Sequence, residues 1–127
     1  MPLEDLKGGT ACVLGAAEGL GAAFSRELAR KGFHLFLVDK NHEALEKIGR
    51  EISHSTQTSV TLHQMDLAES GAVDTLRSVF KENNVTFLVY NAAYGPVRPF
   101  LQNTREDLDK YIHVNMATTL HVVYDFM

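Results

Sequence analysis

Three glycines are spaced along a short segment in a pattern that could bind a phosphate group. Gly15, Gly19 and Gly21 form the sequence G-x-x-x-G-x-G, directly after the apolar run at residues 10–14. At the end of a strand, the first glycine permits a tight turn, the second lets the backbone approach a pyrophosphate, and the third lets a helix pack closely on the strand. The amides at the start of that helix would add donors for an anion. The segment therefore predicts an anion site at a strand-to-helix turn.

A carboxylate lies at the sequence distance expected for a dinucleotide site. Asp39 follows Gly21 by eighteen residues and comes directly after the apolar run at residues 33–38. There it can accept hydrogen bonds from both hydroxyls of an adenosine ribose, whereas it would repel a 2′-phosphate. Glu18 adds negative charge to the glycine segment, and only Lys40 opposes it. These charges favour NAD as the cofactor and make NADP a weaker candidate.

The apolar periodicity predicts strands and helices that alternate around these residues. Strands are expected at residues 10–14, 33–38, 59–65 and 85–90, with a helix after each of the first three. The inward faces of the three helices are expected to carry Leu20, Phe24 and Leu28, then Leu45, Ile48 and Ile52, then Val73, Leu76 and Val79. This alternation is typical of a doubly wound α/β domain with a parallel sheet, and we expect one such domain over residues 1–127.

The segment after the fourth predicted strand combines an irregular connection with a final helix. Residues 91–103 hold one glycine and two prolines, so we expect no regular structure there, and connections of this length often carry function. Thr104 and Asp107 match a capping box with Asp in the place of Glu, which predicts a helix start. Its apolar face is expected to include Leu108, Ile112, Val123 and Phe126. Asn115 lies on the same stripe, and a buried amide needs hydrogen-bond partners.

These motifs together resemble the short-chain dehydrogenase/reductase family along nearly the whole chain. The glycine segment is similar to the family's Thr-Gly-x-x-x-Gly-Ile/Leu-Gly, with Leu14 in the place of Thr, and Asp39 is similar to the acid that ends the second strand. Residues 66–67 resemble the acid-plus-apolar pair that holds adenine. Residues 90–93 resemble the family's Asn-Asn-Ala-Gly, with Tyr and Ala in the outer positions. Asn115 matches the Asn of the next helix.

The resemblance implies the fold, the cofactor contacts and one catalytic residue. It implies a sheet of strand order 3-2-1-4, corresponding to the amino-terminal part of the family domain, and a place for Asn115 in the catalytic relay. The helix that carries Asn115 is expected to join subunits into a homo-oligomer. The implied cofactor-binding residues are Gly15, Ala17, Glu18, Gly19, Leu20, Gly21, Asp39, Asp66, Leu67, Asn91, Ala92 and Ala93.

Two catalytic groups of the family have no counterpart in the sequence. Hydride transfer in the family depends on a Ser and on a Tyr with a Lys four residues later, because the Tyr must exchange a proton with the substrate oxygen. None of the six lysines has a Tyr four residues before it, and the last serine is Ser78. Tyr94 and Arg98 imitate the spacing, but they lie in the irregular connection, where we expect a loop contact. Both catalytic groups are expected beyond Met127, so the chain is expected to be incomplete at its carboxyl end.

We therefore expect the cofactor-binding part of an NAD-dependent oxidoreductase that interconverts small-molecule alcohols and carbonyls, and we expect this part to be inactive alone. The alternative is a noncatalytic dinucleotide-binding or interaction module. A flavodoxin-like domain is disfavoured, because the glycine spacing and Asp39 suit a dinucleotide rather than a single phosphate.

Composition excludes several other classes of protein. The formal charge of −4 comes with no basic stripe, which argues against a nucleic-acid partner. The apolar runs are far shorter than the ~18 residues that a membrane helix needs, so no membrane partner is expected. The six histidines include no pair four residues apart, and no metal site is expected. The single cysteine, Cys12, lies in an apolar run and is expected to be buried in a cytoplasmic protein.

Overall fold

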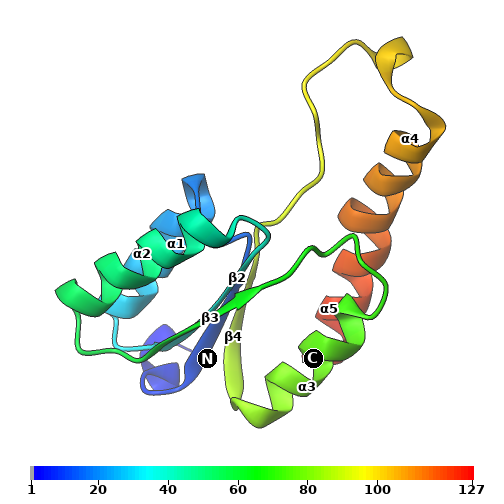
Figure 1. Cartoon of the computed structure of the whole chain (residues 1–127). Helices are drawn as coiled ribbons and strands as arrows, with labels where there is room; N and C mark the ends of the chain where they lie inside the picture. The colour runs from blue at the N-terminus through cyan, green and yellow to red at the C-terminus, as the bar shows by residue number, and fades with distance from the viewer. Residues whose placement is uncertain (1) are drawn as a thin grey trace.

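The computed structural model describes residues 2–127, in which four strands form one parallel sheet (Figure 1). Their order is β3-β2-β1-β4, and all three pairings are parallel, so the predicted strand order 3-2-1-4 is confirmed. The strands are β1 (Thr10–Leu14), β2 (His34–Asp39), β3 (Val60–Gln64) and β4 (Val85–Tyr90). Because the strands are parallel, their carboxyl ends and the loops that follow them meet at one edge of the sheet.

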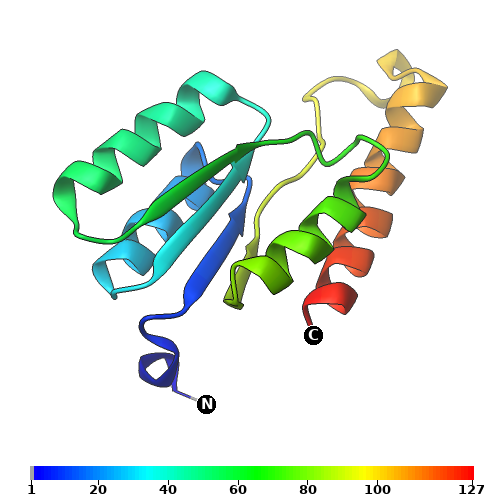
Figure 2. The ribbon, with the colours of Figure 1, turned by 60° about the horizontal axis from the view of Figure 1, so that its bottom comes forward.

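Helices cover both faces of this sheet. One face carries α1 and α2, and the other carries α3 and α5, which lie side by side (Figures 1 and 2). The helices are α1 (Gly19–Arg30), α2 (His42–Ser55), α3 (Ala72–Glu82), α4 (Arg105–Ile112) and α5 (Thr119–Phe126). Short 3-10 turns are η1 (Leu3–Leu6) and η2 (Phe100–Gln102), and η3 (His113–Thr118) is a π-helical segment between α4 and α5. The doubly wound α/β class is therefore confirmed.

The two central strands, β1 and β2, are buried on both faces, because each face of the sheet packs against its own group of helices. Leu14 and Leu37 are fully buried, and the two faces have separate apolar cores. Edge strand β3 is more exposed, with Leu62 at 38%. Continuous apolar runs are typical of strands that are covered on both sides. This burial fixes the ends of β1 and β2, from which Gly15 and Asp39 extend.

The predicted inward face of the first helix is wrong at two positions. Leu20 and Phe24 are 71% and 47% exposed, whereas the residues that α1 buries are Gly21, Ala22, Ser25, Leu28 and Ala29. The helix approaches the glycine turn so closely at Gly21 that small residues face the sheet. Apolar spacing alone therefore predicts the helix correctly but not its orientation.

The predicted face of the last helix is also wrong at two of its four positions, for a different reason, whereas Phe126 packs against the core as predicted. Ile112 and Val123 are exposed, at 58% and 39%, and the buried residues of this stretch are Val114, Thr118 and Val122. The π-helical segment η3 makes a wider turn than an α-helix, and it shifts which residues face the sheet on its two sides. A periodicity of 3.6 residues cannot be extended across such a turn.

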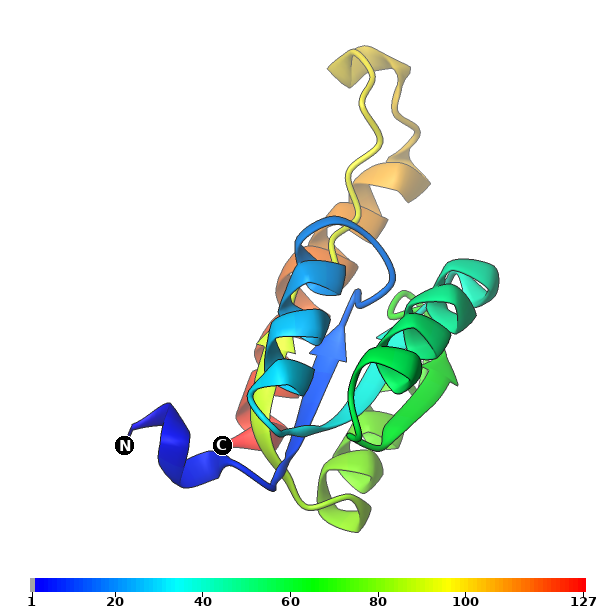
Figure 3. The same ribbon diagram turned by 90° about the vertical axis from the view of Figure 1, so that its left-hand side faces the viewer.

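The connection after β4 leaves the sheet and runs outward before the chain returns along α4 (Figures 1 and 3). It is irregular as predicted except for the single 3-10 turn η2. The predicted capping box at the start of α4 is present, with reciprocal hydrogen bonds between Thr104 and Asp107. Over residues 2–127, no helix is long and apolar enough to cross a membrane.

Candidate functional site

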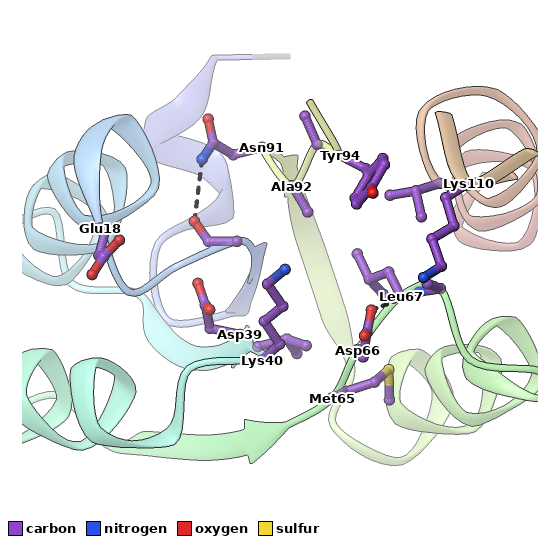
Figure 4. Close-up of a pocket in the computed structure, with 15 residues that line it drawn as sticks. Glu18, Asp39, Lys40, Met65, Asp66, Leu67, Asn91, Ala92, Tyr94 and Lys110 are labelled. Atoms are coloured by element: carbon purple, nitrogen blue, oxygen red, sulfur yellow. Dashed lines mark hydrogen bonds between the residues drawn. The ribbon is translucent and has the colours of Figure 1, made fainter. Parts of the chain in front are cut away.

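A cavity of about 470 Å³ lies at the carboxyl ends of the strands (Figure 4). It is bounded by the turn after β1, by the ends of β2 and β3, by the segment after β4 and by one side of α4. The predicted cofactor residues that line it are Gly15, Glu18, Asp39, Asp66, Leu67, Asn91, Ala92 and Ala93. Four motifs that are distant in sequence therefore meet around one space, at the edge where open α/β sheets bind ligands.

The glycine turn is shaped by two close approaches of backbone. Gly15 has φ +79°, and a Cβ there would lie 2.8 Å from the Ala92 amide nitrogen. A Cβ at Gly21 would overlap the Gly15 carbonyl oxygen and lie 2.9 Å from Asn91 Nδ2. These positions need glycine because a side chain would push α1 and the segment after β4 away from the turn.

Hydrogen bonds hold this turn in place from three sides. The amides of Gly15 and Ala16 donate to the Val38 carbonyl oxygen at 2.8 and 3.1 Å. Asn91 Nδ2 donates to the Gly15 carbonyl oxygen at 3.1 Å, the bond drawn in Figure 4. The Ala17 amide donates to Asp39 Oδ2 at 3.0 Å. The turn is therefore braced by its neighbours, although Leu14 offers no hydroxyl group.

Asp39 braces the glycine turn and also presents acceptor sites to the cavity. Its Oδ2 accepts from Ala17 and its Oδ1 accepts from the Asn41 amide at 3.0 Å, so the carboxylate is held in one orientation at the cavity wall. A carboxylate has about four acceptor sites, which leaves one free on each oxygen. These free sites are suited to the adjacent hydroxyl groups of a ribose.

The remaining predicted residues of the glycine segment contribute backbone rather than cavity surface. Ala17 is buried, and Gly19, Leu20 and Gly21 form the first turn of α1. The N-cap residue, Glu18, makes no side-chain hydrogen bond to that turn. The first amides of a helix have no partner within the helix, so this end of α1 can bind an anion such as a pyrophosphate.

The Asp66–Leu67 pair offers a polar and an apolar group side by side. Asp66 Oδ1 accepts from the Ala68 amide at 2.9 Å, which fixes the carboxylate after β3. Leu67 is buried in the core between the sheet and α3, and its carbonyl oxygen accepts from Thr118 Oγ1 at 3.3 Å. The pair is suited to a flat heterocycle that needs one polar contact and an apolar surface.

Asn115 differs from the prediction of a buried amide. Its side chain is exposed and does not line the cavity, because η3 places it beside the segment after β4. Asn115 Oδ1 accepts from the Tyr94 amide at 2.8 Å, and its Nδ2 donates to the Tyr94 carbonyl oxygen at 2.7 Å. Both polar atoms of the amide are thus satisfied by the backbone of one residue.

Sequence reasoning missed several residues of the cavity wall. Lys110 of α4 and Tyr94 face the cavity (Figure 4), and Val114, one turn after Lys110 in η3, also lines it. The four-residue spacing of Lys110 and Val114 is a signal of a shared helix face, but nothing in the sequence places that face at the cavity. The other lining residues beyond the predicted set are Val38, Lys40, Met65 and Ala68.

Two expected properties concern cysteine and metals. Cys12 is fully buried, as predicted, and burial raises the pKa of its thiol to about 12. Within the described residues 2–127, no group of three or more His, Cys, Asp or Glu side chains could hold a metal ion.

The parallel sheet of order 3-2-1-4, its flanking helices and the glycine turn at its carboxyl edge define a Rossmann-like domain. The family model described as short chain dehydrogenase matches residues 9–127, and the chain belongs to this family. The resemblance inferred from the motifs is therefore confirmed.

Individual relatives agree with this assignment. The chain is 32% identical over 125 residues to the very-long-chain 3-oxoacyl-CoA reductase of Laccaria bicolor, covering 95% of this chain and 37% of that protein. It is 25% identical over 127 residues to the 7beta-hydroxysteroid dehydrogenase of Mediterraneibacter gnavus, covering 100% and 48%. The structure of a 3-oxoacyl (acyl-carrier-protein) reductase from Agrobacterium tumefaciens C58 with NADP bound has a TM-score of 0.85 and 28% identity, covering 100% and 50%. The chain spans half or less of the length of these relatives.

Proposed function

We propose that this chain is the nicotinamide-dinucleotide-binding part of an oxidoreductase that interconverts an alcohol and a carbonyl. The proposal rests on the cavity itself. The glycine turn, Asp39, the Asp66–Leu67 pair and residues 91–93 all line it. The pyrophosphate would lie at the start of α1, the adenosine ribose at Asp39 and the adenine beside Leu67.

NAD is the proposed cofactor, on the basis of charge. Asp39 is fixed at the cavity wall with one free acceptor site on each oxygen, and Glu18 lies in the same wall. A 2′-phosphate placed at Asp39 would meet this negative charge. Lys40 and Lys110 also line the cavity, and their positive charge reduces the discrimination between NAD and NADP. The reductase from A. tumefaciens has NADP bound, so preference must be measured for this chain.

The test is a comparison of NADH and NADPH affinities by calorimetric titration. A charge-assisted hydrogen bond contributes about 1.5 to 3 kcal/mol, so we expect the wild-type chain to bind NADH at least about tenfold more tightly. Asp39→Arg should reverse the ratio. Its absolute affinities should fall too, because the Ala17 amide loses its acceptor.

The matched control is Glu82→Arg, which makes the same type of charge change at an exposed residue that ends α3. It should leave the ratio of the two affinities unchanged. A wild-type chain that binds NADPH as tightly as NADH, or an unchanged ratio in Asp39→Arg, would contradict the NAD assignment. Failure to bind either dinucleotide would contradict the proposed function as a whole.

The chain alone is proposed to bind cofactor without turnover. It has no serine after Ser78 and no Tyr-x-x-x-Lys sequence, which are the groups that the family uses for proton transfer. The substrate class is a small-molecule alcohol or carbonyl, in line with the names of the relatives. NADH absorbance followed with a panel of secondary alcohols should stay unchanged. Appreciable turnover by these 127 residues would refute the claim.

A homo-oligomer is the proposed assembly. Large apolar side chains are exposed along one stretch of helix from α4 to α5: Ile112, Met116, Leu120, Val123 and Tyr124. Exposed apolar patches of this kind commonly mark contact surfaces. Light scattering that finds a monomer at all concentrations would count against the assembly. A cytoplasmic location remains a proposal, supported by the unpaired, buried Cys12.

A further inference from the structure

One carboxylate outside the predicted cofactor motifs gathers groups from two separate segments of the chain. Asp107 Oδ1 accepts from the Tyr94 hydroxyl at 2.8 Å. Its Oδ2 accepts from the Thr104 amide at 2.9 Å and from Thr104 Oγ1 at 3.0 Å, and it lies 3.5 Å from the Arg98 guanidinium. We call Tyr94, Arg98, Thr104 and Asp107 the Asp107 cluster. It joins the segment after β4 to the first turn of α4.

Tyr94 is held at both its backbone and its side chain. The Asn115 amide bonds to its backbone N–H and carbonyl, while the hydroxyl bonds to Asp107. Its ring packs edge-on against Tyr111, with ring centroids 5.2 Å apart and an interplanar angle of 73°. With both ends fixed and the ring packed, the side chain has little freedom to adopt another rotamer.

This restraint matters because, beyond Tyr94, the segment has few contacts with α4: the Tyr111 hydroxyl donates to the Pro96 carbonyl oxygen at 3.2 Å, and Arg98 approaches Asp107. Figures 1 and 3 show residues 91–104 extending away from the sheet, and Val97, Phe100 and Leu101 are at least 71% exposed. Exposed connections of this kind are usually mobile. Tyr94, in contrast, lines the cavity beside Lys110 (Figure 4), as Val114 also does. The Asp107 cluster therefore lies between the exposed part of this segment and the cavity wall that includes Tyr94, Lys110 and Val114.

We propose that Tyr94 and Asp107 are a positioning pair that holds the α4 side of the dinucleotide cavity in its binding shape. The inference rests on the proposed function and adds to it a residue pair that neither the glycine turn nor the acid motifs contain. The hydroxyl-to-carboxylate bond fixes the Tyr94 ring, and the ring, packed on Tyr111, keeps the segment after β4 against α4. A wall that is ordered before the ligand arrives lowers the entropy cost of binding.

The pKa shifts of Asp107 and Tyr94 agree with a hydrogen bond between them that persists at neutral pH. Hydrogen bonds from the Thr104 backbone and from the Tyr94 hydroxyl, with Arg98 nearby, lower the pKa of Asp107 to about 2. The same bond to Asp107 is the main cause that raises the pKa of Tyr94. The carboxylate therefore stays charged and the hydroxyl stays protonated at neutral pH.

The test is a double-mutant cycle read as NADH affinity in the 127-residue chain. Tyr94→Phe removes the hydroxyl and keeps the ring, and we expect it to weaken NADH binding about fivefold while the melting temperature changes little. In an Asp107→Ala background the same change should have no further effect, because the pair acts as a unit. The matched control is Tyr124→Phe, since Tyr124 is 82% exposed, and it should bind NADH like the wild type.

A second measurement does not depend on the ligand. Hydrogen exchange of the Tyr94 amide, which donates to Asn115 Oδ1, should become about tenfold faster in Tyr94→Phe, while the amides of β1 keep their protection. If Asp107→Ala fails to fold, this measurement on Tyr94→Phe and the control still decides whether the hydroxyl holds the segment.

The outcomes separate this inference from the proposed function. A wild-type chain that binds NADH, together with a Tyr94→Phe variant of equal affinity or an additive cycle, overturns the positioning pair and leaves the proposed function standing. A wild-type chain that binds no NADH overturns the proposed function and with it the role of the pair in binding. Unchanged exchange of the Tyr94 amide overturns the restraint in either case.

Discussion

Replacement of Gly21 by alanine tests whether close backbone approach shapes the glycine turn. The added Cβ would overlap the Gly15 carbonyl oxygen and lie 2.8 Å from its carbonyl carbon. Because these are backbone atoms rather than the end of a flexible side chain, α1 must move away from the turn. Overpacking costs typically 1–3 kcal/mol, and we expect a value at the upper end, about 3 kcal/mol. At about 2.1 cal/mol/K of unfolding entropy per residue, this corresponds to a melting temperature lower by about 10 °C.

The assay is thermal unfolding followed by circular dichroism, with NADH titration of the folded variant. Gly32→Ala is the matched control: Gly32 has φ +90°, but no heavy atom of the described residues lies within 4 Å of its added Cβ. Only backbone strain of about 1 kcal/mol is expected there, with NADH affinity unchanged. A Gly21→Ala variant that melts within about 3 °C of the wild type and binds NADH equally well would refute the packing argument.

Two further predictions concern ionisable groups. Cys12 is fully buried and its pKa is raised to about 12, so a thiol reagent at neutral pH should leave it unmodified in the folded chain and label it completely in urea. Fast labelling of the native chain would contradict this burial. Asp107 has a folded-state pKa of about 2, below the ordinary value of 3.8, so its stabilising contribution is present above about pH 4 and is lost as the pH falls toward 2. NMR titration of its carboxyl carbon should give a midpoint well below 3.8 that rises in Tyr94→Phe, and a midpoint near 4 in the wild type would show that the cluster does not form.

The parts of the fold that the sequence predicts well are those set by local pattern. The runs at residues 10–14 and 85–90 appear as strands with the same bounds, and the capping box at Thr104 forms as expected. Each depends on a short-range rule: continuous apolar residues for a buried strand, or an N-cap paired with the residue three positions later. Strand order follows from the resemblance to a family of known topology.

The errors arise where tertiary contacts decide. Leu20 and Phe24 have helical spacing but are exposed, because the contact at Gly21 orients the helix with its small residues toward the sheet. Asn115 is exposed because the π-helical segment changes the phase of the helix. The glycine motif predicts that the helix packs closely at Gly21 but not which other residues then face the sheet, and nothing in the local sequence predicts the π-helical segment. For the same reason, Lys110 and Val114 could not be assigned to the cavity.

Two residues that depart from the family motif, Leu14 and Tyr90, each make a structural contact in this chain. Leu14 supplies an apolar side chain where the family has Thr, and it is fully buried in the core on the α3 side of the sheet. The bracing is carried instead by Val38, Asn91 and Asp39.

Tyr90, in the place of the family's first Asn, links strand β4 to the π-helical segment. Its hydroxyl donates to the Val114 carbonyl oxygen at 3.2 Å, and Thr119 Oγ1 donates to the same oxygen at 3.2 Å. The two hydroxyl groups add side-chain donors to a carbonyl of the π-helical segment, whose backbone bonds run from residue i to i+5. Tyr90 thus holds the backbone of Val114 at the cavity wall. Asn115, the residue after Val114, holds the backbone of Tyr94. Tyr90 therefore contributes a hydrogen bond that supports the cavity wall at Val114.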